Sequence, residues 1–359
     1  MSIEKMRIES VAPVRVDLAG GTVDIWPLYL LLDAPKTVNF GVNLFARTIL
    51  ECEPSTQPSV RISSVDLSKS QEFSWEEILD EHTRAIPELD LPVRLLRYFA
   101  KLHTHPRALS LEIRTEAKSP AGAGLGGSSA LSISIIGALW KWVNPRTPLD
   151  LERDGEFLIS LTRDVESQVL YGPAGLQDYY GAAFGGLQVL SWNIARNTRE
   201  TLPVETLKEL EARTLLFYSG KSRNSGINNW HLFKGLIDKD PEIDRKFRAI
   251  VSATAKLEEA LQERDFHAVV AAVREEWETR RTLAPGISTP EMEAACSRAL
   301  EVTDLAFKVC GAGGGGCFFI LLPEKNPEIR EKVKQAVLKS SEIRALSFEA
   351  VPHGLTVRT

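Results

Sequence analysis

Alternating apolar and polar residues near the start of the chain predict β-strands. Residues 7–12 and 15–19 both alternate in this way, and we interpret them as two strands separated by a turn at Pro13. The pair Gly20-Gly21 ends the second of them. The same criteria predict further strands at residues 38–52, 60–65 and 109–117.

A longer period marks the helices. Leu131, Ile135, Ala138, Leu139 and Trp142 recur at the spacing of one helical face, which predicts an amphipathic helix beginning at about Ser128, directly after a run of glycines and serines. Two more helices are predicted at residues 92–102 and 151–170.

The second half of the chain repeats this mixture after a break. Residues 185–192 resemble a strand, and the polar, aperiodic stretch that follows suggests a boundary between a domain at 1–195 and a domain at 196–359. The elements expected beyond it are a strand at 214–219, helical residues 227–300 broken at 240–241 and 285–286, strands at 307–310 and 317–322, a helix at 328–340 and a last strand at 348–357. Two strand-and-helix domains in series predict an α+β protein with a cleft between them.

Composition excludes several classes of protein. The 359 residues are 43% hydrophobic and carry a net charge of −5, which gives no electrostatic reason to bind nucleic acid or an anionic membrane. Four cysteines without a C-x-x-C pair suggest neither a disulfide framework nor a zinc site. We find no signal peptide and no apolar run near the ~18 residues of a membrane span, so we expect a cytoplasmic protein.

The glycine run at residues 120–130 is the first candidate for chemistry. Gly122, Gly124 and Gly127 match G-x-G-x-x-G, but the second short strand with an acidic end that a dinucleotide fold requires is missing. A P-loop is excluded because Ser128 stands where its lysine would be. Backbone amides at a helix N-terminus still make an anion site, so we interpret the run as a phosphate-holding loop. A glycine-rich turn that merely allows close packing of helix on strand is the alternative.

A second glycine run, at residues 309–317, lies between two apolar strands. A simple hairpin needs only two to five residues there and one or two glycines. The excess of glycine indicates backbone lying against another molecule or another loop. The two runs are therefore predicted to form two walls of one ligand cleft.

With these motifs in hand, the sequence resembles the GHMP kinases, the family of galactokinase, homoserine kinase, mevalonate kinase and phosphomevalonate kinase. The resemblance rests on residues 12–21, 120–130 and 308–317, which stand in the family's order and at its separations. It implies an N-terminal domain of the ribosomal-S5-like type and a C-terminal ferredoxin-like domain. It also implies that ATP is held by the middle motif. The residues expected there are Pro120, Gly122, Gly124, Leu125, Gly126, Gly127, Ser128 and Ser129.

The resemblance further implies catalytic roles. Ser128 and Glu166 match the family's Mg²⁺ ligands, Asp178 matches its catalytic base, and Arg15 matches the cation beside that base. Each has a simpler alternative. Glu166 could pair on its own helix with Arg163, Asp178 could be an Asx-turn residue, and Arg15 could lie on an exposed strand face.

On the substrate side, the resemblance points towards carbohydrate. Asp24 matches an acidic residue that binds sugar hydroxyls, with a turn or N-cap role as the alternative. Gly20-Gly21 departs from the Gly-Glu-His run of galactokinase, and the chain looks more like the heptose-7-phosphate kinase and fucokinase branch. A basic loop with Lys221 and Arg223 would suit an anionic sugar substituent, although an ordinary solvated loop is an equal alternative. The expected substrate residues are Asp24, Gly20, Gly21, Gly175, Gly313, Gly314, Lys221 and Arg223.

The expected activity is transfer of the ATP γ-phosphoryl group, with Mg²⁺, to a hydroxyl of a small sugar or sugar phosphate. Three alternatives remain at this point. They are a mevalonate-type kinase of the same family, a catalytically silent sensor of sugar and ATP, and an NAD-dependent oxidoreductase.

Overall fold

Two sheets organise the protein, which a computed structural model describes at residues 5–104, 106–222 and 230–359. The first sheet has the order β12-β1-β2-β5-β3-β4, and β6 pairs with β2 and with β7. Its strands are β1 (Met6–Ala19), β2 (Lys36–Pro54), β3 (Val60–Ser64), β4 (Lys69–Phe73), β5 (Leu109–Ala117), β6 (Leu187–Ser191), β7 (Thr198–Thr201) and β12 (Thr356–Arg358). The second sheet is antiparallel, in the order β11 (Arg344–Leu346), β8 (Thr214–Tyr218), β10 (Cys317–Leu321), β9 (Ala306–Val309).

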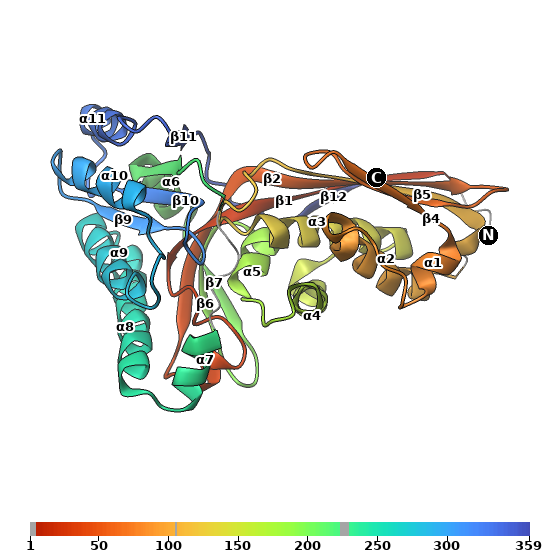
Figure 1. Cartoon of the computed structure of the whole chain (residues 1–359), viewed down its shortest axis with the longest axis horizontal. Coiled ribbons are helices and arrows are strands. Elements are labelled where there is room, and N and C mark those ends of the chain that lie inside the picture. Colours follow the sequence, from red (N-terminus) through yellow and green to blue (C-terminus); the bar gives the residue numbers. More distant parts are fainter. Residues whose placement is uncertain (1–4, 105, 223–229) are drawn as a thin grey trace.

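Helices pack beside both sheets (Figure 1). Those beside the first sheet are α1 (Trp75–Leu79), α2 (Asp90–Leu102), α3 (Gly127–Val143), α4 (Leu151–Leu170) and α5 (Gln177–Phe184). Those of the second half are α6 (Val204–Arg213), α7 (Trp230–Ile237), α8 (Pro241–Glu263), α9 (Phe266–Arg280), α10 (Pro290–Leu300) and α11 (Pro327–Val337). Short 3-10 turns lie at Leu28–Leu31, Pro87–Leu89 and Pro106–Ala108. Among the described helices, none is both long and apolar enough to span a bilayer.

Most predicted elements are confirmed, and the exceptions have identifiable causes. The prediction of a turn at Pro13 is wrong, because β1 runs continuously through this residue, with a register shift between Ala12 and Val14. A bulge is where a strand tolerates proline, since the ladder loses no hydrogen bond there. The long helical stretch has a further break at Arg264, whose φ of 59° ends α8 before Asp265 caps α9.

The end of the chain also differs from expectation. No strand covers residues 348–355 of the described chain; β11 and β12 flank that stretch and belong to different sheets. The expected division at residue 195 falls between β6 and β7, which pair with each other. The first sheet thus continues to Thr201, and the chain returns to it at β12.

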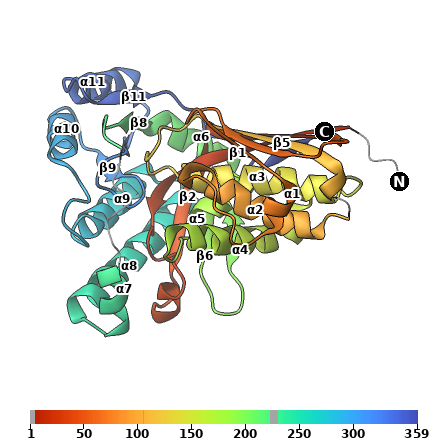
Figure 2. The ribbon, with the colours of Figure 1, turned by 45° about the vertical axis from the view of Figure 1, so that its right-hand side comes forward.

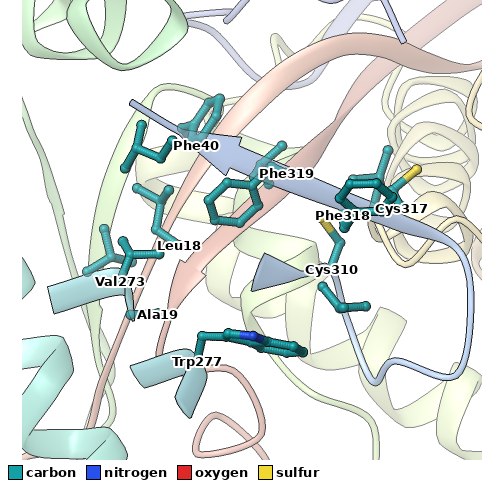
Figure 3. Packing of buried hydrophobic residues seen from close by; sticks show 14 of the residues in the cluster. Leu18, Ala19, Phe40, Val273, Trp277, Cys310, Cys317, Phe318 and Phe319 are labelled. Carbon is teal, nitrogen blue, oxygen red and sulfur yellow. The ribbon is translucent and has the colours of Figure 1, made fainter. Parts of the chain in front are cut away.

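The two halves share one apolar core. Leu18 and Phe40 of the first sheet pack with Val273 and Trp277 of α9 and with Phe319 of β10 (Figure 3). Helices α3 and α5, which belong to the first half of the chain, contact β1. Helix α9, which belongs to the second half, contacts both β1 and β9 (Figures 1 and 2). Burial of this shared core fixes the end of β1 against α9, and that end carries the first motif.

Candidate active site

Arg15 of β1 and Asp178 of α5 form the first candidate pair. Arg15 Nε donates to Asp178 Oδ1 at 2.8 Å, and Nη2 lies 2.6 Å from the same oxygen. Arg15 Nη1 donates to the carbonyl of Gly124 at 2.8 Å. Burial lowers the pKa of Arg15, but attraction by Asp178 and Asp17 outweighs it, so that pKa is raised above its ordinary value. A buried, permanently charged guanidinium thus holds a carboxylate that remains one-quarter exposed.

The simpler interpretations of these residues do not fit the structure. Arg15 is buried, not on an exposed strand face, and Asp178 lies inside the first turn of a helix, not in an Asx turn. Arg163 pairs with its neighbour Asp164 at 2.7 Å, so it is not the partner of Glu166.

The middle glycine run lies directly beside this pair. Its helix, α3, begins at Gly127, one residue before the expected start. The carbonyl of Leu125 accepts a hydrogen bond from the Arg15 amide at 3.0 Å. Gly124 has a φ of 76°, and a Cβ there would lie 2.4 Å from the carbonyl oxygen of Cys310. A side chain is therefore excluded, and the loop lies between β1 and the third motif, directly before the N-terminus of α3.

Ser128 and Glu166 also meet, although they are 38 residues apart in the sequence. Ser128 Oγ donates to Glu166 Oε1 at 2.7 Å. Two further hydroxyls approach the other oxygen, Oε2: Tyr179 at 2.7 Å and Ser129 at 3.4 Å. Burial raises the pKa of Glu166, although the hydroxyls from Ser128 and Tyr179 act in the opposite direction.

This oxygen donor set fits Mg²⁺. Mg²⁺ in phosphoryl-transfer sites is typically held by one or two carboxylates together with substrate phosphates. One buried carboxylate and one hydroxyl beside the glycine run at the start of α3 match the protein part of that arrangement. Within the described residues, no cluster of three or more His, Cys, Asp or Glu side chains could hold an ion by itself.

Asp24 lies close to Asp178. Its Oδ2 accepts a hydrogen bond from the amide of Gln177 at 3.0 Å, which satisfies a free N–H at the start of α5. Ile25 forms an isolated bridge with Gly175, where a Cβ would lie 2.5 Å from Asp24 Oδ2. Burial raises the pKa of Asp24 to about 6. The N-cap alternative is thus partly right, since Asp24 supports a helix that is distant in the sequence.

The other expected substrate residues have partners of their own. Gly20 donates its amide to Glu276 Oε1 at 3.3 Å, while Gly314 donates to the carbonyl of Ile287 at 2.9 Å. Gly313 lies against Ile287 as well. Lys221 is half-exposed and pairs with Glu291 at 2.6 Å, although its carbonyl accepts from Gly316 of the third motif. Arg223 lies outside the described residues.

A buried ionic cluster beside Gly20-Gly21 was not predicted from the sequence. Lys308 Nζ donates to Glu276 Oε2 at 2.5 Å and lies 3.8 Å from Asp17. Arg280 donates to the carbonyl of Gly311 at 2.9 Å and lies 3.8 Å from Glu276. Burial alone would raise the pKa of Asp17, but Lys308 and Arg280 hold it below its ordinary value. One feature of the sequence could have indicated this cluster. Glu276 and Arg280 lie four residues apart on α9, and the other buried residues of that helix are apolar.

Comparison with known proteins gives a consistent result. A model described as "GHMP kinases N terminal domain" matches residues 90–186, and one described as "GHMP kinases C terminal" matches residues 257–340. A D-glycero-alpha-D-manno-heptose 7-phosphate kinase of Campylobacter jejuni is 28% identical over 324 residues, which cover 89% of this chain and 90% of that protein. An L-fucokinase/L-fucose-1-P guanylyltransferase of Bacteroides fragilis is 24% identical over 92% of this chain and 36% of its own length.

Solved structures share the fold. A D-glycero-D-manno-heptose 1-phosphate kinase of Bacteroides thetaiotaomicron matches with a TM-score of 0.73 at 22% identity, covering 98% of this chain and 99% of its own. A galactokinase of Lactococcus lactis, complexed with galactose, matches with a TM-score of 0.75 at 15% identity, covering 98% of this chain and 95% of its own. The expected two-domain α+β fold is confirmed.

Proposed function

Because this chain belongs to the GHMP kinase family and is a kinase, we propose that it transfers the γ-phosphoryl group of ATP to a hydroxyl of a sugar or sugar phosphate. The observation that carries the proposal is the meeting of two pairs on one glycine loop. Arg15 contacts the loop at Gly124 and holds Asp178, whose side chain lies against Gly126, and Ser128 and Glu166 meet at the helical end of the loop. Phosphoryl transfer needs this kind of positioning of charge more than it needs covalent chemistry.

Each pair has a distinct role in the proposed reaction. Amides between Gly122 and Ser129, together with the α3 dipole, hold the ATP phosphates. Ser128 and Glu166 would hold Mg²⁺, which would supply positive charge to neutralise the phosphate oxygens. Asp178 accepts the proton of the attacking hydroxyl, and Arg15 orients that carboxylate and offsets negative charge on the group in transfer.

The substrate is proposed from Asp24 and from the relatives. Asp24 lies at the start of the helix that carries Asp178, so a hydroxyl held by one carboxylate reaches the neighbourhood of the other. The heptose 7-phosphate kinase and the fucokinase both act on carbohydrates by name. A cytoplasmic location belongs to the same proposal, and four free cysteines support it.

ADP release over a panel of acceptors tests the proposal. Free heptoses, hexoses and deoxyhexoses, their phosphates, and mevalonate are each incubated with ATP and Mg²⁺. We expect turnover with a sugar or sugar phosphate and none with mevalonate. Turnover only with mevalonate would assign the chain to that branch of the family, and binding of sugar and ATP without turnover would make it a sensor.

A further inference from the structure

The two oxygens of Glu166 have different surroundings. Among the described residues, Oε1 receives only the hydroxyl of Ser128, an exposed residue at the start of α3. Oε2 receives the hydroxyl of the fully buried Tyr179 at 2.7 Å and the more distant hydroxyl of buried Ser129. One edge of the carboxylate thus faces the phosphate-binding loop, and the other edge is fixed in the protein interior.

Tyr179 is suited to act as a fixed donor. Its side chain is fully buried, and its hydroxyl lies 2.7 Å from Oε2 of Glu166, a carboxylate oxygen that can only accept the hydrogen bond. Its backbone belongs to α5, directly after Asp178. Successive side chains of one helix therefore contact the two halves of the site: Asp178 contacts Arg15, and Tyr179 contacts Glu166.

We infer that Tyr179 is a positioning residue for the metal: by holding Oε2 of Glu166, it keeps Oε1 directed towards Ser128, so that these two residues would hold Mg²⁺ together. The inference rests on the proposed function and adds a residue to it. Without the tyrosine hydroxyl, the described residues leave Oε2 only the long contact to Ser129, and a buried carboxylate that is short of donors turns away from this position. Such a movement weakens its hold on a cation.

The neighbouring residue supplies a matched control. Tyr180 is also buried, but its hydroxyl donates to Glu156 at 2.5 Å, outside the candidate site. Tyr179→Phe and Tyr180→Phe therefore remove the same atom from adjacent positions of one helix. Only the first of these hydroxyls contacts Glu166.

The test measures Mn²⁺ binding by electron paramagnetic resonance in the presence of a non-hydrolysable ATP analogue, with circular dichroism to verify folding. We expect Tyr179→Phe to raise the Mn²⁺ dissociation constant about 5- to 30-fold, and Tyr180→Phe to change it less than about twofold. Binding of the analogue without metal should be unchanged in both variants. Glu166→Gln should remove the Mn²⁺ site.

Several outcomes would overturn the inference. Unchanged Mn²⁺ affinity in folded Tyr179→Phe would remove the role of Tyr179 and leave the proposed function intact, and equal weakening by both variants would reduce that role to packing. If Tyr179→Phe does not fold, Ser129→Ala, which removes the other donor to Oε2, must weaken Mn²⁺ binding about 2- to 5-fold, and no change there would also overturn it. Absence of Mn²⁺ binding by the wild-type complex would instead reject the metal site itself.

Discussion

At the level of single residues, the surroundings of Asp24 disfavour the charged form of its carboxyl group. It is almost fully buried, and burial raises its pKa to about 6. The folded protein therefore keeps the Asp24 proton over a range in which the unfolded chain loses it, so stability falls as pH rises from about 4 to about 6 and stays lower above that range. A carboxylate kept at such a position is expected where a ligand uses it.

Asp24→Asn should therefore stabilise the fold while weakening the use of the sugar substrate. At pH 7 we expect a gain on the order of 1–3 kcal/mol in the free energy of unfolding, and little gain at pH 4. The KM for the sugar should rise, because an amide replaces the carboxylate that accepts hydrogen bonds from the sugar hydroxyls in our proposal. Urea unfolding at both pH values measures the first effect, with Asp33→Asn, a 95% exposed carboxylate, as the control. An equal change in stability at the two pH values would contradict this reasoning.

At the level of elements, the contact with the third glycine loop fixes the middle glycine loop. Gly124 packs on the Cys310 carbonyl, and Cys317 donates its amide to the carbonyl of Ala123 at 2.7 Å. The loop that binds ATP in our proposal is thus supported by the other half of the chain.

Gly124→Ala should separate these loops. The methyl group would meet the Cys310 oxygen at 2.4 Å in a backbone with a φ of 76°, so we expect ATP affinity to fall at least about tenfold. Gly286→Ala is the matched control, because Gly286 has a φ of 79° and nothing within 4 Å of its Cβ position. Calorimetric titration with an ATP analogue compares them. Similar losses in both variants would show that backbone strain, and not the contact, is responsible.

Local sequence signals predicted the elements that carry such signals. The bounds of α4 match the prediction, since Asp150 caps it and its apolar face is regular. The short helix α5, which carries Asp178 and Tyr179, was not predicted, because its eight residues include a glycine and are largely buried on all sides, so no amphipathic period appears. The motifs located Arg15, Glu166 and Asp178, whereas Tyr179 has no signal outside the structure.

At the level of the whole molecule, α9 joins the first motif to the third. Glu276 accepts the Gly20 amide and the Lys308 ammonium, while Arg280 holds the Gly311 carbonyl. Gly20 and Glu276 are 256 residues apart, so no local pattern could pair them. The cluster sits in the shared core, where each charge depends on its partner.

Lys308→Met should destabilise the protein by about 3–5 kcal/mol, because it leaves Glu276 and Asp17 buried without their ammonium. Adding Glu276→Gln should restore part of that loss, since the uncompensated carboxylate is removed. Urea unfolding of the two single variants and the double variant measures the coupling. Strictly additive losses would show that Lys308 and Glu276 do not act as a pair.

The central claim is that Asp178, oriented by Arg15, accepts the proton of the hydroxyl that attacks ATP. Rapid-quench measurement of phosphoryl transfer in Asp178→Asn tests it most directly, with Asp154→Asn, a carboxylate paired with Arg153 outside the site, as the control. We predict a loss of about 10²–10⁴ in the transfer rate with ATP affinity little changed. A variant that keeps more than about a third of the wild-type rate, where general-base catalysis requires at least a ~10²-fold loss, would contradict the claim and mean that the hydroxyl gives its proton directly to the γ-phosphate.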